Sequence, residues 1–240
     1  MAFFSKKYCD ICDEKIGLLG NKKLIDGNMC KNCAGLLSPH FTNRRKTSLE
    51  DIKDHLAYRE NNKKDVAAFN ATRTIGRNTK VILDEDAGRF IVSSAGSWQN
   101  QNPDVIDFSQ VTGCQTEIRE YKTELKWKDK DGNDVSFSPR RYEIDYDFFV
   151  TIEINSPWFN QINFKINDRR VDIRGSVEYR EMERQSKEIK ETLTQVRQEV
   201  RESVVAASAA KTAQTCSFCG ATTTPDPRGC CEFCGGAVQG

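Results

Sequence analysis

The chain has 240 residues, of which 38% are hydrophobic and 30% charged, and its formal net charge is +1. The near-neutral charge argues against a protein whose main function is to bind the phosphates of a nucleic acid. The sequence has no apolar run long enough to cross a bilayer and no secretory signal near its start, so we expect a cytoplasmic protein. In that compartment paired CxxC motifs bind metal more often than they form disulfides.

Ten cysteines divide the chain into three parts. Four lie within the first 33 residues and five within the last 25, so that only Cys114 falls between them. This distribution predicts two small cysteine-dependent modules on either side of a cysteine-poor middle.

The first module, expected over residues 1–46, contains two C-x2-C pairs. Its cysteines are Cys9, Cys12, Cys30 and Cys33. A CxxC turn directs two sulfurs to the same side, so two such turns supply the four ligands of a tetrahedral zinc ion. Residues 22–27 predict a hairpin between the pairs, and residues 34–37 a helical turn after them. This order is typical of a treble-clef-like four-cysteine zinc finger, with a redox-active or disulfide-bonded CxxC pair as the alternative.

A connecting amphipathic helix is expected over residues 47–76. Thr47 and Ser48 precede an acidic first turn, as an N-cap does. Apolar residues then recur at near-helical spacing, at Ile52, Leu56, Val66 and Phe69. Charged residues fill the positions between them, which predicts one packed face and one solvated face.

Residues 77–176 predict an antiparallel β domain. From Tyr142 to Ile154 nearly every second residue is apolar, and a turn leads into a return strand over residues 162–166. Shorter candidate strands lie at 80–83, 89–92, 105–108, 113–120, 124–128 and 134–137. One-sided alternation and short connections favour a sheet curled over a core, and this number of strands suits a small antiparallel β-barrel.

A long helix or linker is expected over residues 177–212. Its narrow apolar stripe consists of Met182, Ile189, Leu193, Val196, Val200 and Val204. We expect the first part of the helix to pack on the barrel and the later part to lead to the C-terminal module. The alternative is a two-stranded coiled coil, with self-association through residues 177–210, although the stripe lasts barely three heptads.

The last module, expected over residues 213–240, repeats the pattern C-x-F-C-G. Its paired cysteines are Cys216, Cys219, Cys231 and Cys234. The glycine after each pair supplies the backbone freedom that a knuckle turn needs. The repeat resembles a bacterial zinc ribbon, and it leaves Cys230 as a surplus cysteine, either a spectator or a substitute ligand.

Both four-cysteine groups are expected to hold Zn2+ in structural sites. A catalytic zinc usually has three protein ligands and a water, whereas four cysteines close the coordination shell. Zinc binding of about 10 to 16 kcal/mol is ample to fold a module with almost no core of its own.

Two segments resemble known families. In the first 40 residues CDIC, GLLGNKKLIDG and MCKNC look like a zinc-binding domain of unknown function found at the N-termini of bacterial proteins, which implies a metal site but no activity. The central sheet followed by a helix, with Asp107–Gly113 leading into a strand, is similar to bacterial pleckstrin-homology-like domains. The second resemblance rests on the order of elements and on that short phrase.

The first module is also basic, with nine Lys and Arg against four Asp and Glu in residues 1–46. Its candidate surface-contact residues are Lys22, Lys23, Arg44 and Arg45. Such a surface suits an anionic partner, either nucleic acid or lipid, although solvated basic fingers are common.

Catalytic residues are not apparent in the sequence, because no Ser/His/Asp set, phosphate-binding glycine loop or distinctive carboxylate pair can be placed. We therefore expect an α+β multi-module protein that is not an enzyme and acts as a zinc-binding adaptor, most simply for a protein partner. Binding of nucleic acid or another anionic surface through the finger is the first alternative. A zinc/thiol redox switch is the second.

Overall fold

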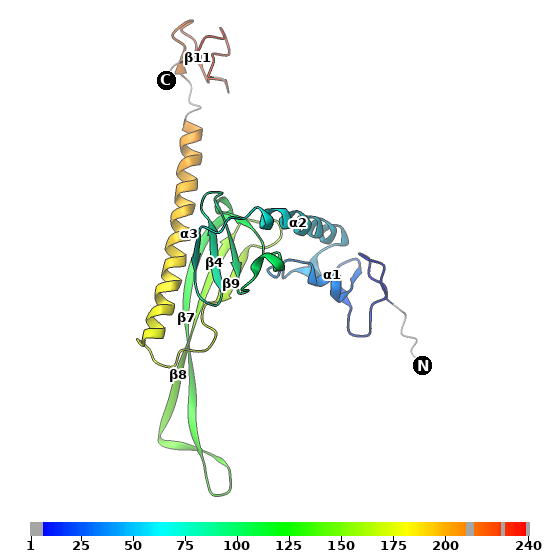
Figure 1. Cartoon of the computed structure of the whole chain (residues 1–240), viewed down its shortest axis with the longest axis vertical. Coiled ribbons are helices and arrows are strands. Elements are labelled where there is room, and N and C mark those ends of the chain that lie inside the picture. Colours follow the sequence, from blue (N-terminus) through cyan, green and yellow to red (C-terminus); the bar gives the residue numbers. More distant parts are fainter. Residues whose placement is uncertain (1–6, 210–213, 227–228, 239–240) are drawn as a thin grey trace. The chain divides into compact units, whose positions relative to one another are not determined.

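The computed structural model describes residues 7–209, 214–226 and 229–238 (Figure 1). The chain forms two compact units, residues 1–194 and residues 195–240, and each is described by itself. Among the described residues no helix is both long and apolar enough to cross a membrane. The structure combines helices with antiparallel sheets, which confirms the predicted α+β class.

The N-terminal finger has the predicted order of a knuckle, a hairpin and a short helix. Strands β1 (Lys22–Lys23) and β2 (Asn28–Met29) pair antiparallel, and helix α1 (Lys31–Gly35) follows directly. Cys30 is the N-cap of α1 and accepts the backbone N–H of Cys33. Buried Leu24 and Met29 pack with the cysteines, so the finger has a small apolar core besides its sulfur cluster.

Helix α2 (Leu49–Ala67) confirms the predicted N-terminus of the connecting helix. It ends well before the expected residue 76, and residues 73–75 form a strand instead. Ser48 caps it, and Asp51 completes a reciprocal capping box with the Ser48 backbone. The buried face of α2 differs from the predicted apolar stripe because three of its five buried residues are polar. The buried residues are Ile52, His55, Arg59, Asn62 and Val66.

The middle of the chain contains two separate antiparallel sheets. The first consists, in spatial order, of β3 (Arg73–Ile75), β4 (Lys80–Asp84), β5 (Arg89–Ser93) and β6 (Ile106–Asp107). The second consists of β7 (Val111–Lys128), β8 (Asp134–Ile154) and β9 (Gln161–Lys165). Their inward side chains, among them Phe90, Phe148 and Ile162, are fully buried.

The sheets are antiparallel as predicted, but the prediction that they close into a barrel is wrong, because both are open among the described residues. Strand β6 has only two residues, and the 3-10 helix η3 (Phe108–Gln110) separates it from β7, so the ladder does not continue from one sheet into the next. Strand β3, which the sequence did not predict, is a short edge strand paired only with β4.

Strands β7 and β8 form a hairpin that is longer than predicted. Each of them unites two of the strands expected from the sequence. The register shifts between Leu125, which pairs with Arg141, and Lys126, which pairs with Ser136, so residues 137–140 bulge out of β8. Strand β9 joins β8 only from Phe149 to Glu153, and the outer part of the hairpin is therefore a two-stranded ribbon (Figure 1).

Helix α3 (Val177–Ala209) confirms the predicted long helix. In the first unit the ring of Tyr179 meets Tyr146 and Phe148 edge-on, at centroid distances of 5.1 and 5.0 Å. The predicted stripe is buried at Met182, Ile189 and Leu193 and half-buried at Val196 and Val200, while the side chain of Val204 lies outside the described residues.

The C-terminal module contains one small hairpin. Strands β10 (Gln214–Thr215) and β11 (Thr222–Thr223) pair antiparallel, and Cys230 forms a single bridge with Ala237. Gly220 and Gly235, the glycines of the two C-x-F-C-G repeats, have φ angles of 72° and 69°. Both turns therefore use the left-handed conformation that favours glycine.

Candidate metal centres

The four sulfurs of the finger lie where a tetrahedral metal ion would hold them. Cys9 and Cys33 are 3.8 Å apart at Sγ, as are Cys12 and Cys30, and all four atoms fall within 4.8 Å of one another. Zinc–sulfur bonds of about 2.3 Å in a tetrahedron separate the sulfurs by about 3.8 Å. A disulfide would require about 2.0 Å, so the cluster fits a zinc ion and not a pair of disulfides.

Backbone groups of the knuckle turns support the thiolate form of the first cysteine. Although burial opposes it, the N–H groups of Cys30, Ile11 and Cys12 lower the pKa of Cys9 to about 7. Burial and the neighbouring thiols instead raise the pKa of Cys33. One thiolate thus forms readily, whereas further negative charge needs a cation at the centre of the cluster.

The sulfurs of the C-terminal module repeat this geometry. Cys216 lies 3.6 Å from Cys234, and Cys219 lies 3.7 Å from Cys231. Burial would raise the pKa of Cys231, but the N–H groups of Cys234 and Phe233 lower it to about 7. For Cys234 the N–H of Gly236 acts in the same sense, yet the thiols of Cys219 and Cys216 raise its pKa to about 12.

The two clusters confirm the prediction of two zinc sites. Each offers four sulfur donors, which complete a tetrahedral shell and suit a structural ion. Cys230 is not a member of its neighbouring cluster. Cys114 is buried in β7, and burial raises its pKa to about 12, which makes it an unreactive thiol.

The predicted basic residues of the finger are brought together. Lys22 and Lys23 of β1 and Arg44 and Arg45 of the 3-10 helix η1 (Arg44–Lys46) line one hollow of about 490 Å³. Asn21, Leu24 and Ile25 complete its wall. Twenty residues of sequence separate the two basic segments, and the fold makes them one surface.

A wider hollow of about 900 Å³ lies beside the first turns of α3. It is far from both sulfur clusters in sequence, and its lining includes Arg77, Glu181 and Arg184. Arg184 forms ion pairs with Glu181 and Glu188, at 2.9 and 2.8 Å, so much of the charge around this hollow is compensated within the protein.

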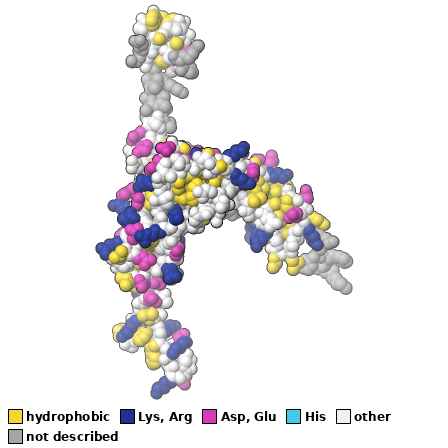
Figure 2. All heavy atoms as spheres, in the orientation of Figure 1, with side chains coloured by type: hydrophobic (Ala, Val, Ile, Leu, Met, Phe, Trp, Pro, Cys, Tyr) yellow, Lys and Arg dark blue, Asp and Glu magenta, His cyan; other side chains and the backbone are white. Residues whose placement is uncertain are grey.

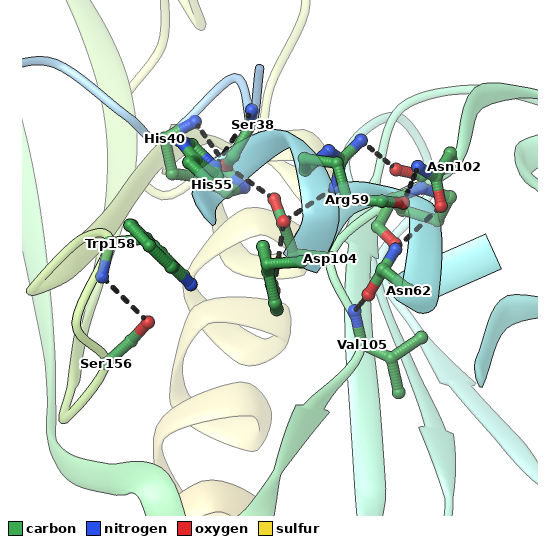
Figure 3. Close-up of polar contacts among 12 residues, drawn as sticks. Ser38, His40, His55, Arg59, Asn62, Asn102, Asp104, Val105, Ser156 and Trp158 are labelled. Carbon is green, nitrogen blue, oxygen red and sulfur yellow. Dashed lines mark hydrogen bonds and ion pairs between the residues drawn. The ribbon is translucent and has the colours of Figure 1, made fainter. Parts of the chain in front are cut away.

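Sequence reasoning missed a buried polar cluster that joins the finger and α2 to the first sheet (Figure 3). Asp104, in the β5–β6 connection, is buried and accepts hydrogen bonds from Ser38, Tyr58 and Arg59 at 2.7, 3.2 and 2.7 Å. The contact with Arg59 is also an ion pair between two buried side chains. Three donors from two other segments thus replace the water that this carboxylate loses on folding.

Asn62 extends this cluster along α2 (Figure 3). Its amide group donates to the Asn102 side chain and to the Pro103 carbonyl, both at 2.7 Å, and its oxygen accepts the Val105 N–H at 2.9 Å. Asn102 in turn donates to the Arg59 carbonyl, and the Arg59 guanidinium donates to the Asn102 carbonyl. The 102–105 segment is therefore fixed to the helix by polar contacts at successive residues.

His55 lies fully buried beside the same cluster. Its ring stacks on Trp158 with centroids 4.9 Å apart, and burial lowers its pKa to about 4. Ser38, His55 and Asp104 come together although no sequence pattern indicates that they form a set. The Ser38 hydroxyl donates to Asp104 and not to the imidazole, so the nucleophile–base contact of a catalytic triad is not formed.

Comparison with known proteins identifies only the first module. Residues 7–55 match a family described as a domain of unknown function, DUF4428. The match covers both CxxC pairs of the finger and ends within α2. No curated protein and no solved structure matches the chain.

Proposed function

We propose that this protein is a non-enzymatic adaptor, stabilised by two zinc ions, which binds another protein through the outer part of the β7–β8 hairpin. The zinc sites supply fold stability in this proposal, and the hairpin supplies the contact. The exposed apolar side chains of the hairpin are the observation that carries it.

These side chains lie beyond the point where β9 stops pairing with β8. Trp127 is 47% exposed and Tyr142 40%, and Ile118 and Leu125 are exposed to a similar degree. Figure 2 shows hydrophobic side chains among charged ones on the surface of this hairpin. Tryptophan and tyrosine contribute most often to the energetic centres of protein interfaces, and grouped exposed apolar residues mark such surfaces.

The hairpin also holds two of its aromatic side chains, Tyr142 and Phe137, against cationic groups. The Lys122 ammonium lies 4.1 Å from the centre of the Tyr142 ring, and the Arg141 guanidinium lies 4.8 Å from that of Phe137. Side chains ordered before association lose less conformational entropy when a partner binds. In addition, β7 is the edge strand of its sheet, so its outer backbone groups are available to an incoming strand.

The order of the elements in the middle of the chain supports a pleckstrin-homology-like assignment for this part. Two antiparallel sheets precede a long helix whose first turns pack on the second sheet. In this proposal the middle of the chain is the scaffold that carries the hairpin. We also propose a cytoplasmic location in a bacterial cell. The two cysteine clusters support it because they fit metal ions and not disulfides, which is typical of a reducing compartment.

The test is affinity purification of the tagged full-length chain from cells that naturally produce it, followed by binding measurements with the purified partner. The variant W127S/Y142S should weaken binding of that partner at least tenfold, because it removes two aromatic anchors. The control I173S/V177S changes two exposed apolar residues outside the hairpin. Equal affinity of the two variants would show that the hairpin is not the binding surface.

A further inference from the structure

Two leucines of the finger are almost completely exposed. The N–H of Gly20 donates to the Gly17 carbonyl at 3.0 Å, which places Leu18 and Leu19 at the corner of a tight turn. Leu18 is 88% exposed and Leu19 93%. Leu24 and Leu37 of the same finger are buried, so the module has a core that the leucine pair does not join.

The basic hollow begins immediately after this turn. Asn21 and Lys22, which follow Gly20, belong to its wall, and exposed Ile25 adds another apolar group there. The lining contains no acidic residue. In Figure 2 hydrophobic side chains and Lys and Arg side chains lie close together on the finger. The surface thus combines apolar and cationic groups.

The cations of the hollow have no counter-ion within the described part of the chain. Lys22, Lys23, Arg44 and Arg45 form no ion pair there, whereas Arg59, Lys63 and Arg73 each do. The Nε of Arg44 is buried and has no hydrogen-bond acceptor among the described residues. A buried donor without an acceptor is costly. The four uncompensated cations, gathered in one hollow, favour an anion from outside the chain.

We propose that the finger docks on the surface of an anionic lipid bilayer, with Leu18 and Leu19 inserted among the headgroups. Lys22, Lys23, Arg44 and Arg45 then face the lipid phosphates and carboxylates. A nucleic-acid backbone would pair with the four cations but would leave the leucines in water. A bilayer interface accepts apolar side chains and cations together, and this favours lipid. This docking goes beyond the adaptor function and does not depend on it.

The experiment is sedimentation of the zinc-loaded full chain with vesicles of pure phosphatidylcholine and with vesicles of equal parts phosphatidylcholine and phosphatidylserine. The chain should bind the anionic vesicles only. Neutralising each of the four cations to glutamine should weaken this binding about fivefold. The variant L18S/L19S should weaken it more than about tenfold, because two inserted side chains are lost.

Matched controls separate docking from general charge and hydrophobicity. K53Q/K64Q removes two exposed charges from α2, and L36S removes an exposed leucine of the same finger that does not line the hollow. Both should leave vesicle binding unchanged. Zinc content and melting temperature of every variant should equal those of the unchanged chain, which excludes loss of the fold as the cause.

Several results would overturn the proposal. One is a chain that does not bind phosphatidylserine vesicles at low salt. Another is vesicle binding that L18S/L19S leaves unchanged. A third is a chain that does not bind vesicles but binds duplex DNA in a way that depends on the four cations. This result would assign the hollow to nucleic acid. None of these results would alter partner binding by the β7–β8 hairpin, so the two proposals fail separately.

Discussion

The N-terminal finger and the C-terminal zinc module have nearly the same sulfur geometry but very different surroundings. In the finger the cysteines pack with buried Leu24, Met29 and Ile52. In the C-terminal module the aromatic residues between the paired cysteines, Phe218 and Phe233, are 74% and 71% exposed. The same metal site can thus complete a small apolar core or take the place of one. The burial of the apolar residues around the cysteines distinguishes the two cases.

Loss of zinc should have the largest effect, and it should differ between the two modules. Cys12 and Cys219 are the matched positions, since both are exposed members of their clusters. We expect C219S to abolish the fold of the C-terminal module, because binding worth about 10 to 16 kcal/mol holds a piece with almost no core. We expect C12S to open the first knuckle and leave α2 folded.

Hydrogen exchange resolved along the chain measures both outcomes. Protection should disappear throughout residues 214–226 and 229–238 in C219S, and it should persist in α2 of C12S at Ile52 and Val66. Equal loss of protection in both modules would show that the core of the finger contributes little without its metal.

Breaking the buried ion pair should have the next largest effect, confined to the first unit. D104N leaves the Arg59 guanidinium buried without its charge partner, which costs about 3 to 5 kcal/mol. Urea unfolding followed by tryptophan fluorescence measures this loss, since Trp98 and Trp158 lie in this unit. E60Q is the control, because it breaks only the exposed pair with Lys63 and should cost less than about 1 kcal/mol. A D104N loss as small as that of E60Q would contradict the role of the cluster.

The pH dependence of stability should show the smallest of the three effects. The pKa of His55 is lowered to about 4 in the folded chain, whereas an unfolded histidine titrates near about 6.5. Below a pH of about 6.5 the unfolded chain binds a proton at His55 that the folded chain does not. The folded chain therefore becomes less stable as the pH is lowered. The full loss between these two values is about 3 kcal/mol.

Other groups also make stability depend on pH, because burial lowers the pKa of His40 as well and the cysteine thiolates titrate. The variant H55Q isolates the contribution of His55. The difference in unfolding free energy between H55Q and the unchanged chain should narrow as the pH falls from about 6.5 to about 4. A difference that stays constant over this range would show that His55 is not held neutral.

Local sequence patterns were sufficient for the features that neighbouring residues determine. The CxxC spacing predicted both sulfur clusters, and the Ser48 cap predicted where α2 begins. Short apolar runs predicted β4 and β5, and alternating apolar residues predicted the buried part of β8. In each case the cause lies within a few residues, as turn geometry, capping or strand period.

Features that depend on distant residues were missed. Asp104 is a single acid in a polar connection, and its partners Ser38 and Arg59 are 66 and 45 residues away in sequence. The continuity of β7 and β8 was missed because charged stretches and Pro139 interrupt the apolar alternation. A two-stranded ribbon buries little, so its sequence need not alternate. Closure of the two sheets was wrongly expected because strand number alone does not determine how β6 and β7 meet.

The buried cluster around Asp104 also limits how far the finger is a portable module. The family match ends at residue 55, about a third of the way along α2, whereas the polar contacts of the helix continue to Arg59 and Asn62. A segment transplanted with those limits would carry its metal ligands but would lose most of its supporting helix and Asp104, the partner of Ser38. In this chain the segment that the family match covers is therefore shorter than the segment that folds together.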